Sequence, residues 1–99
     1  MAYQNINICR SFNQSLSTAL VSLSAQVCSE VIIYNRTGET IEVYDNNYSS
    51  SDNAFILSNN DTLVVRGVTN TNQVSAKTLA GGGTICYRTQ YFSNFAQGL

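Results

Sequence analysis

One stretch decides the fold class: residues 30–44, which read Glu30-Val31-Ile32-Ile33-Tyr34-Asn35-Arg36-Thr37-Gly38-Glu39-Thr40-Ile41-Glu42-Val43-Tyr44. Apolar residues recur in it at every second position, which is the period of a β-strand. Val31 and Ile33 share one face of the first half, and Ile41 and Val43 share one face of the second. Gly38 suits a tight turn because glycine adopts positive φ without steric cost. The stretch therefore predicts a hairpin of residues 30–34 and 40–44.

The same pattern continues along the chain. Polar clusters rich in Asn, Asp, Ser and Gly separate short apolar runs, as turns separate strands. An outward-facing Lys77 favours an edge strand at residues 74–79, because a charge there discourages edge pairing. Residues 45–53 contain almost nothing to bury and are expected to form an exposed loop. Further strands are expected at residues 55–57, 62–68, 74–79 and 84–92. We predict an all-β fold, a single small β-sandwich or barrel of about six to eight antiparallel strands.

The first 27 residues are ambiguous between a helix and an extended segment. Phe12, Leu16 and Leu20 recur at near-helical spacing, whereas Val21 and Val27 belong to an alternating run. The many Ser and Thr residues disfavour a helix, so we expect an extended arm that becomes a strand from about Leu20. The predicted organisation is an N-terminal arm or first strand at residues 1–19 and one β-sandwich domain at residues 20–99. The chain has no Pro and no linker composition, which argues against a second domain.

Composition narrows the classes of partner. The 99 residues are 43% hydrophobic but only 11% charged, with a net charge of -1. No basic run is present, so no nucleic-acid partner is expected. No long apolar segment or basic leader is present either, so we expect a soluble, unexported chain with no membrane partner.

Few residues are suited to catalysis or metal binding. The chain has no His and one Lys, and its six carboxylates are scattered. Glu39 and Glu42 are three residues apart and lie on opposite faces of a strand, which makes them a poor acid-base pair. Gly81, Gly82 and Gly83 lack the lysine and the following helix of a phosphate-binding loop, so we expect a plain connector. We predict a protein that is not an enzyme and has no cofactor and no metal.

Three cysteines are present: Cys9, Cys28 and Cys86. Their number is odd and their spacing is not that of a metal site. The expectation for each is a small buried hydrophobic residue with a free thiol. The alternative is a disulfide between Cys28 and Cys86, which both border strong strand patterns, with Cys9 left unpaired.

Candidate contact residues are aromatic, arginine or apolar residues on strands or near the termini. Tyr and Arg are enriched in protein interfaces because they combine contact area with directed hydrogen bonds. Strands that are apolar on two faces also need more cover than one small sheet provides. The predicted partner-binding residues are Tyr3, Ile6, Ile8, Phe12, Tyr34, Tyr44, Tyr48, Arg66, Arg88, Tyr91 and Phe95.

Between Cys28 and Ser93 the pattern resembles small virion structural proteins of tailed bacteriophages. The segments that carry it are Val31-Ile32-Ile33-Tyr34-Asn35-Arg36-Thr37-Gly38, Phe55-Ile56-Leu57, Val65-Arg66-Gly67-Val68-Thr69-Asn70 with Gln73-Val74-Ser75-Ala76, and Tyr87-Arg88-Thr89-Gln90. The resemblance implies a capsid decoration or cement protein, present in many copies or as a homo-oligomer. Its partners would be the major capsid protein or other virion subunits. Its location would be the virion, assembled in the host cytoplasm.

Two alternatives stay open at the level of sequence. One is a neck, tail or baseplate component of the virion. The other is a small carbohydrate-binding β module, in which Tyr44 and Tyr48 would stack on sugars and nearby amides would bind hydroxyls.

Overall fold

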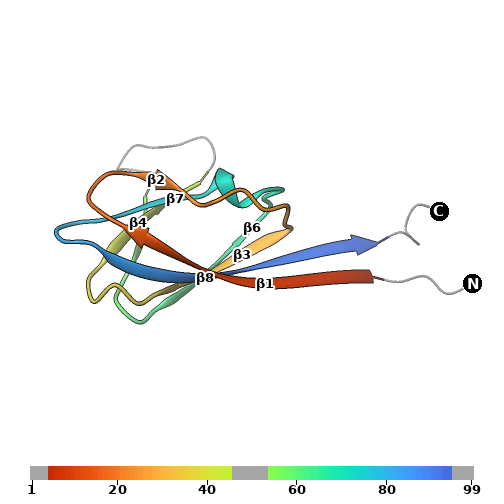
Figure 1. Cartoon of the computed structure of the whole chain (residues 1–99), viewed down its shortest axis with the longest axis horizontal. Helices are drawn as coiled ribbons and strands as arrows, with labels where there is room; N and C mark the ends of the chain where they lie inside the picture. The colour runs from red at the N-terminus through yellow and green to blue at the C-terminus, as the bar shows by residue number, and fades with distance from the viewer. Residues whose placement is uncertain (1–4, 46–53, 95–99) are drawn as a thin grey trace, which may run out of the picture.

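The fold is all-β, as predicted, and the computed structural model describes residues 5–45 and 54–94 (Figure 1). Eight strands form two four-stranded antiparallel sheets that pack face to face as a sandwich. The elements are β1 (Asn5–Leu16), β2 (Val21–Ser22), β3 (Glu30–Asn35), β4 (Ile41–Tyr44), β5 (Phe55–Leu57), β6 (Thr62–Arg66), the 3-10 turn η2 (Thr71–Gln73), β7 (Ser75–Thr78) and β8 (Gly83–Asn94).

Each sheet combines strands from distant parts of the chain. The first sheet has the order β1-β8-β3-β6, and the second has the order β2-β7-β4-β5. In the first sheet Ile33 pairs with Leu63 on one side and with Tyr87 on the other. The edges of the first sheet are therefore β1 and β6, and those of the second are β2 and β5.

The core lies between the two sheets and takes alternate residues from their strands. Val31, Ile33 and Ile41 are fully buried, as the alternation predicts. Leu63 and Val65 pack against this core, also as predicted. The buried hydrophobic residues are Leu16, Leu23, Cys28, Val31, Ile33, Ile41, Val43, Tyr44, Leu57, Val68, Val74, Ala76, Ile85 and Tyr87.

The predicted hairpin of residues 30–34 and 40–44 is wrong. β3 belongs to the first sheet and β4 to the second, so residues 36–40 cross from one layer to the other. The reason is Asn35, which is fully buried rather than exposed in a turn. Its side chain binds backbone groups on both sides of the crossover, and the alternation of apolar residues does not reveal this role.

Two further expectations about strands are wrong. β7 is an internal strand between β2 and β4, and Lys77 Nζ lies 3.6 Å from Glu42 Oε1 on the neighbouring strand, which offsets the charge that suggested an edge. The strand expected from about Leu20 is only two residues long, and Val27 forms an isolated bridge with Asn70. Residues 23–28 instead contact the neighbouring segment through separate backbone hydrogen bonds, such as the one from the Leu23 amide to the Val74 carbonyl.

β1 and β8 form a long two-stranded ribbon that leaves the sandwich. They pair along their whole length, from Asn5 opposite Asn94 to Leu16 opposite Gly83. β3 accompanies β8 only as far as Gln90, which pairs with Glu30. Beyond that point the ribbon projects past the body of the domain (Figure 1), and the molecule measures 54 × 23 × 19 Å. Most of the segment predicted as an arm or first strand is thus the first strand of a sheet.

Candidate protein-protein interface

An open apolar groove lies where the two sheets end at β5 and β6. Phe55 on β5 is 54% exposed and Val64 on β6 is 41% exposed, and both line the groove. Ile56 does not line it, but is 53% exposed on the other face of β5. The groove has a volume of about 350 Å³. Contiguous exposed apolar side chains on a soluble domain mark surfaces that partners cover. The lining residues are Val43, Tyr44, Asp45, Phe55, Leu63, Val64, Val65 and Arg66.

The backbone at this groove is open as well. β5 and β6 are edge strands of their sheets, so one side of each has no strand partner among residues 5–45 and 54–94. Natural sheets protect such edges with Pro, Lys or bulges, because an open edge accepts additional strands. Neither Phe55–Leu57 nor Thr62–Arg66 contains Pro or Lys. The groove therefore offers both apolar contact area and unused backbone hydrogen-bonding groups.

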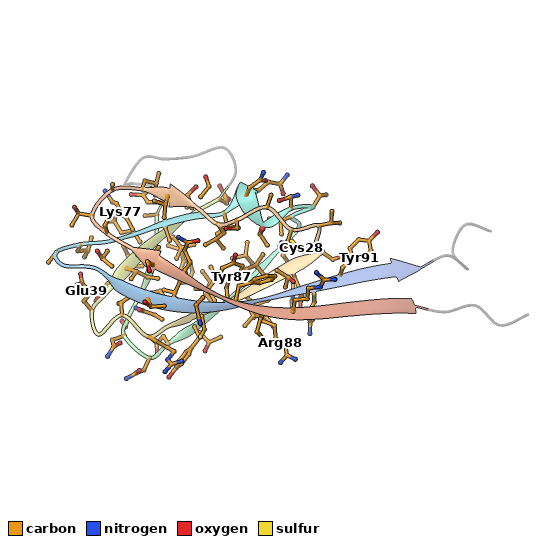
Figure 2. The ribbon with its side chains drawn as sticks, in the orientation of Figure 1. Cys28, Glu39, Lys77, Tyr87, Arg88 and Tyr91 are labelled. Atoms are coloured by element: carbon orange, nitrogen blue, oxygen red, sulfur yellow. The ribbon has the colours of Figure 1, made fainter. Side chains whose placement is uncertain are left out.

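A second hollow lies where the ribbon leaves the sandwich. Its volume is about 250 Å³, and Arg10, Gln26, Val27, Thr89 and Tyr91 line it. Val27 is 63% exposed, which is unusual for a β-branched apolar residue beside a core. Tyr91 lies on the same side of β8 as Cys28, whereas Arg88 projects from the opposite side (Figure 2). The described side chains around this hollow thus come both from the ribbon and from the segment before β3.

The outer face of the first sheet carries a polar cluster around Cys86. The Cys86 thiol donates to Asn13 Oδ1 at 2.9 Å, and Arg36 Nη1 donates to Cys86 Sγ at 3.5 Å. Asn13, Arg36, Thr84 and Cys86 surround a hollow of about 190 Å³. Arg66 and Arg88 are exposed, and Arg66 Nε donates to Glu30 Oε2 at 3.3 Å. This face presents a thiol and guanidinium groups to solvent.

The disulfide between Cys28 and Cys86 does not form, because the two residues lie on opposite sides of the first sheet. Cys28 is buried in the core, as expected, and burial raises the pKa of its thiol. Cys86 is a free thiol too, but it is half-exposed on the outer face, contrary to the expected burial. Cys9 pairs with Gln90 in the ribbon.

The glycine-rich connector is not a plain loop, because it binds the carboxylate of Glu39. The amides of Ala80, Gly81 and Gly82 donate to that carboxylate at 2.9, 3.0 and 3.2 Å. These bonds, led by the one from Ala80, lower the pKa of Glu39. Gly82 has φ +124°, and a Cβ there would approach the Leu16 carbonyl oxygen to 2.8 Å. The connector thus binds an anion through successive backbone amides, as a phosphate loop does, but the anion is the carboxylate of Glu39.

Tyr44 is not a surface residue, contrary to the prediction. It is 2% exposed, and its hydroxyl donates to Glu42 Oε1 at 2.7 Å. That hydrogen bond, with a smaller contribution from desolvation, raises the pKa of Tyr44 to about 12. The ring therefore cannot stack on a sugar in this conformation, and the carbohydrate-binding alternative loses one of its two aromatic residues.

The other predicted contact residues fall into distinct places. Tyr34 is exposed on the outer face of the first sheet, and its hydroxyl lies 3.5 Å from Asn60 Oδ1. Phe12 is half-buried and stacks on Tyr87 with ring centroids 5.3 Å apart, so it belongs to the edge of the core. Ile6 and Ile8 lie on the projecting part of β1. Tyr3, Tyr48 and Phe95 lie outside the described residues.

Phe55, Ile56 and Val64 were missed as contact residues. The signal was present in the sequence, because Phe55-Ile56-Leu57 is a very short strand with apolar residues at consecutive positions. A strand that is apolar on both faces and lies between polar turns must either be buried on both sides or leave one side uncovered.

The described part of the chain lacks two other kinds of feature. No group of three or more His, Cys, Asp or Glu residues in it is placed to hold a metal ion. Nor does that part contain a helix of the length and apolarity that crossing a membrane requires.

Comparisons with known proteins support the fold. No protein-family model matches the chain, and no curated protein matches it. Among solved structures it is similar to a protein of Bacillus endospore appendages, which are described as a novel family of disulfide-linked pili. The match covers 92% of this chain and 90% of that one, with a TM-score of 0.52 and 13% identity. At this identity the likeness establishes a shared sandwich architecture.

Proposed function

We propose that this chain is a non-enzymatic structural subunit that acts by binding other subunits of a larger assembly, either further copies of itself or the subunits of a shell. The observation that carries the proposal is the open edge at β5 and β6, where exposed apolar side chains and unpaired strand edges coincide. A surface of this kind is costly for a protein that acts alone, because it promotes uncontrolled association.

The use of the polar residues supports a structural role. The Glu39 carboxylate accepts hydrogen bonds from backbone amides of the glycine-rich connector. The Glu42 carboxylate accepts one from the Tyr44 hydroxyl and lies beside Lys77. These carboxylates therefore stabilise contacts between strands. An acid-base role would instead require a group available to a substrate.

A fibre is the form of assembly that the solved neighbour supports, since that protein belongs to a pilus. The virion location, inferred from the resemblance to phage structural proteins, is the other form of the proposal. In that case the partners would be capsid subunits, and the chain would decorate or cement a shell. Both the fibre and the virion form require many copies of the chain and no catalytic activity.

The test is the state of association of the purified full chain. Light scattering after size-exclusion chromatography and negative-stain electron microscopy, over a wide range of concentration, should show oligomers or fibres. A chain that stays monomeric at the highest soluble concentration but saturates purified phage capsids supports the virion form. A monomer that binds neither itself nor capsids would contradict the proposed function.

A further inference from the structure

We propose that the groove at β5 and β6 accepts the projecting part of β1 from a second copy of this chain. The incoming strand would pair with the open edge of β6 and extend the first sheet from one molecule into the next. This inference rests on the proposed function and names the two surfaces that make the contact.

The acceptor is built to take a strand that is apolar at alternate positions. Leu63 and Val65 of β6 are half-buried and line the groove together with Val43. Val64 lies between them in sequence, is exposed, and pairs with Ile32 in the sheet. A strand added beside β6 would direct every second side chain into the groove and the others to the outer face, as in β-strand addition.

The donor is residues 5–9 of β1, which read Asn5-Ile6-Asn7-Ile8-Cys9. β1 is the other edge strand of the first sheet, and no strand in the described part of the chain pairs with its outer side. Cys9 lies opposite Gln90, the last residue of β8 that pairs with β3, and residues 5–8 lie beyond it, so this part of β1 extends past the sandwich (Figure 1). Its isoleucines occupy alternate positions, and its five residues match the five of β6.

The ribbon itself requires a partner on physical grounds. An isolated two-stranded ribbon is marginally stable in water, and stability needs a further strand or a covering surface. Residues 5–9 include no charge and no Pro that would oppose pairing, and β6 has no charge before Arg66. The donor segment and the first four residues of β6 therefore carry no charge that would oppose their pairing.

A second copy is the occupant because each molecule carries one donor and one acceptor on different surfaces. Such a contact is heterologous, so addition of a copy leaves one donor and one acceptor free, and growth continues unless the geometry closes a ring. The competing arrangement is isologous, with the β1 strands of two copies paired to each other, and it would stop at a dimer.

The experiment compares three substitutions of an apolar residue by lysine in the full chain. Ile8→Lys alters the donor and Val64→Lys alters the acceptor edge. Leu79→Lys is the matched control, because Leu79 is 53% exposed, similar to Val64, but lies away from both surfaces. Thermal unfolding monitored by circular dichroism verifies that all three variants are folded.

The expected result is that Ile8→Lys and Val64→Lys each reduce the fraction of assembled protein by roughly tenfold or more. A lysine in place of Ile8 would have to be desolvated in the groove, and a lysine in place of Val64 puts a charge on the strand edge that pairs. Leu79→Lys should assemble like the unchanged chain. A mixture of the two defective variants should form a heterodimer and stop there, because the intact donor of one fits the intact acceptor of the other.

Other outcomes separate the two proposals. If the unchanged chain assembles and folded Val64→Lys assembles equally well, the β6 acceptor is wrong, whereas the structural role survives. If Ile8→Lys alone abolishes assembly and the mixture gives no heterodimer, the isologous arrangement replaces the proposed one. If the unchanged chain does not assemble and binds no capsid, the proposed function itself fails.

Discussion

Two regions of this sandwich differ in whether their surfaces are satisfied by contacts within the chain. At the crossover between β3 and β4, buried and half-buried polar groups are satisfied within the chain. At the edge formed by β5 and β6, apolar side chains and strand edges face solvent. This difference is the reason we propose that a partner binds at the β5 and β6 edge and not at the crossover.

Asn35 shows how the crossover is closed. Its Nδ2 donates to the Glu39 carbonyl at 2.7 Å and to the Leu57 carbonyl at 3.0 Å. Its Oδ1 accepts from the Thr37 amide at 3.0 Å and from the Thr37 hydroxyl at 2.7 Å. One side chain thereby connects the first sheet, the crossover and β5. Of the described side chains that line the groove, Tyr44 and Arg66 bind residues of their own sheets and do not bridge the two layers as Asn35 does, which is why we assign association to that side.

The largest effect is expected in the interior that both regions share. Ile33→Asp should prevent folding, because a buried carboxylate without a partner costs more to desolvate than a domain of this size can offset. Circular dichroism should show no cooperative thermal transition. Ile32→Asp, on the opposite face of the same strand, is the matched control and should remain folded; a folded Ile33→Asp protein would place Ile33 outside the core.

At the crossover, Asn35→Leu should lower the free energy of unfolding by about 3 kcal/mol, since it removes all the hydrogen bonds of this buried side chain and leaves the Leu57 carbonyl and the Thr37 amide without them. Chemical denaturation in urea measures the loss. Asn59→Ala is a milder change nearby, where an exposed side chain accepts from the Gly38 amide at 2.9 Å, and should cost at most about 1 kcal/mol. Equal losses for the two variants would remove the special role of Asn35.

Thr78 is an exception at the closed end, because its hydroxyl is buried without a hydrogen-bond partner. Thr78→Val has the same shape and should raise the free energy of unfolding by up to about 1 kcal/mol. Thr71→Val is the matched control, because the buried Thr71 hydroxyl donates to the Ser24 carbonyl, and it should be destabilising. A destabilised Thr78→Val would reveal a partner for that hydroxyl.

Glu39→Gln should cause a smaller loss that depends on pH. The folded state lowers the pKa of Glu39, so its ionised carboxylate stabilises the fold at neutral pH, above the ordinary value of 4.5. This stabilisation disappears as the pH falls through the lowered pKa. The melting temperatures of the two proteins should therefore differ at pH 7 and converge in acid, and a difference that is constant with pH would contradict the role of the charge.

The smallest effect on stability is expected at the open edge. Val64→Lys should change the free energy of unfolding of the monomer by no more than about 0.5 kcal/mol, because Val64 is already substantially exposed. Urea denaturation at a concentration where the chain is dissociated provides the measurement. A large loss would mean that this edge is part of the folding core, and the contrast between the two regions would vanish.

The sequence revealed strands better than their arrangement. Period-two patterns in residues 30–34, 62–66 and 84–92 depend on burial of alternate residues, which is a local property. The assignment of β3 and β4 to different sheets depends on the burial of Asn35, and the internal position of β7 depends on Lys77 lying beside Glu42. Both are tertiary contacts between segments that the periodicity treats separately.

The residues of the candidate interface could likewise be predicted only in part from the sequence. Ile6 and Ile8 were predicted as apolar contact residues near the N-terminus, and they do lie on the projecting strand. Tyr44 was misplaced because its position on the outer face of β4 suggested exposure, whereas the structure buries its ring and binds its hydroxyl to Glu42. Phe55 and Val64 became visible only when the topology placed them at two unpaired edges.

The pairing of β1 with β8 has a consequence for how the chain reaches its native state. These strands are separated by more than sixty intervening residues, yet they form the longest ladder in the molecule. Closure of such a long loop costs entropy before any contact repays it, so folding should be slow for a domain of this length. Until the two strands pair, their edges are open to strands of other newly made chains. Pairing between chains would then compete with correct folding.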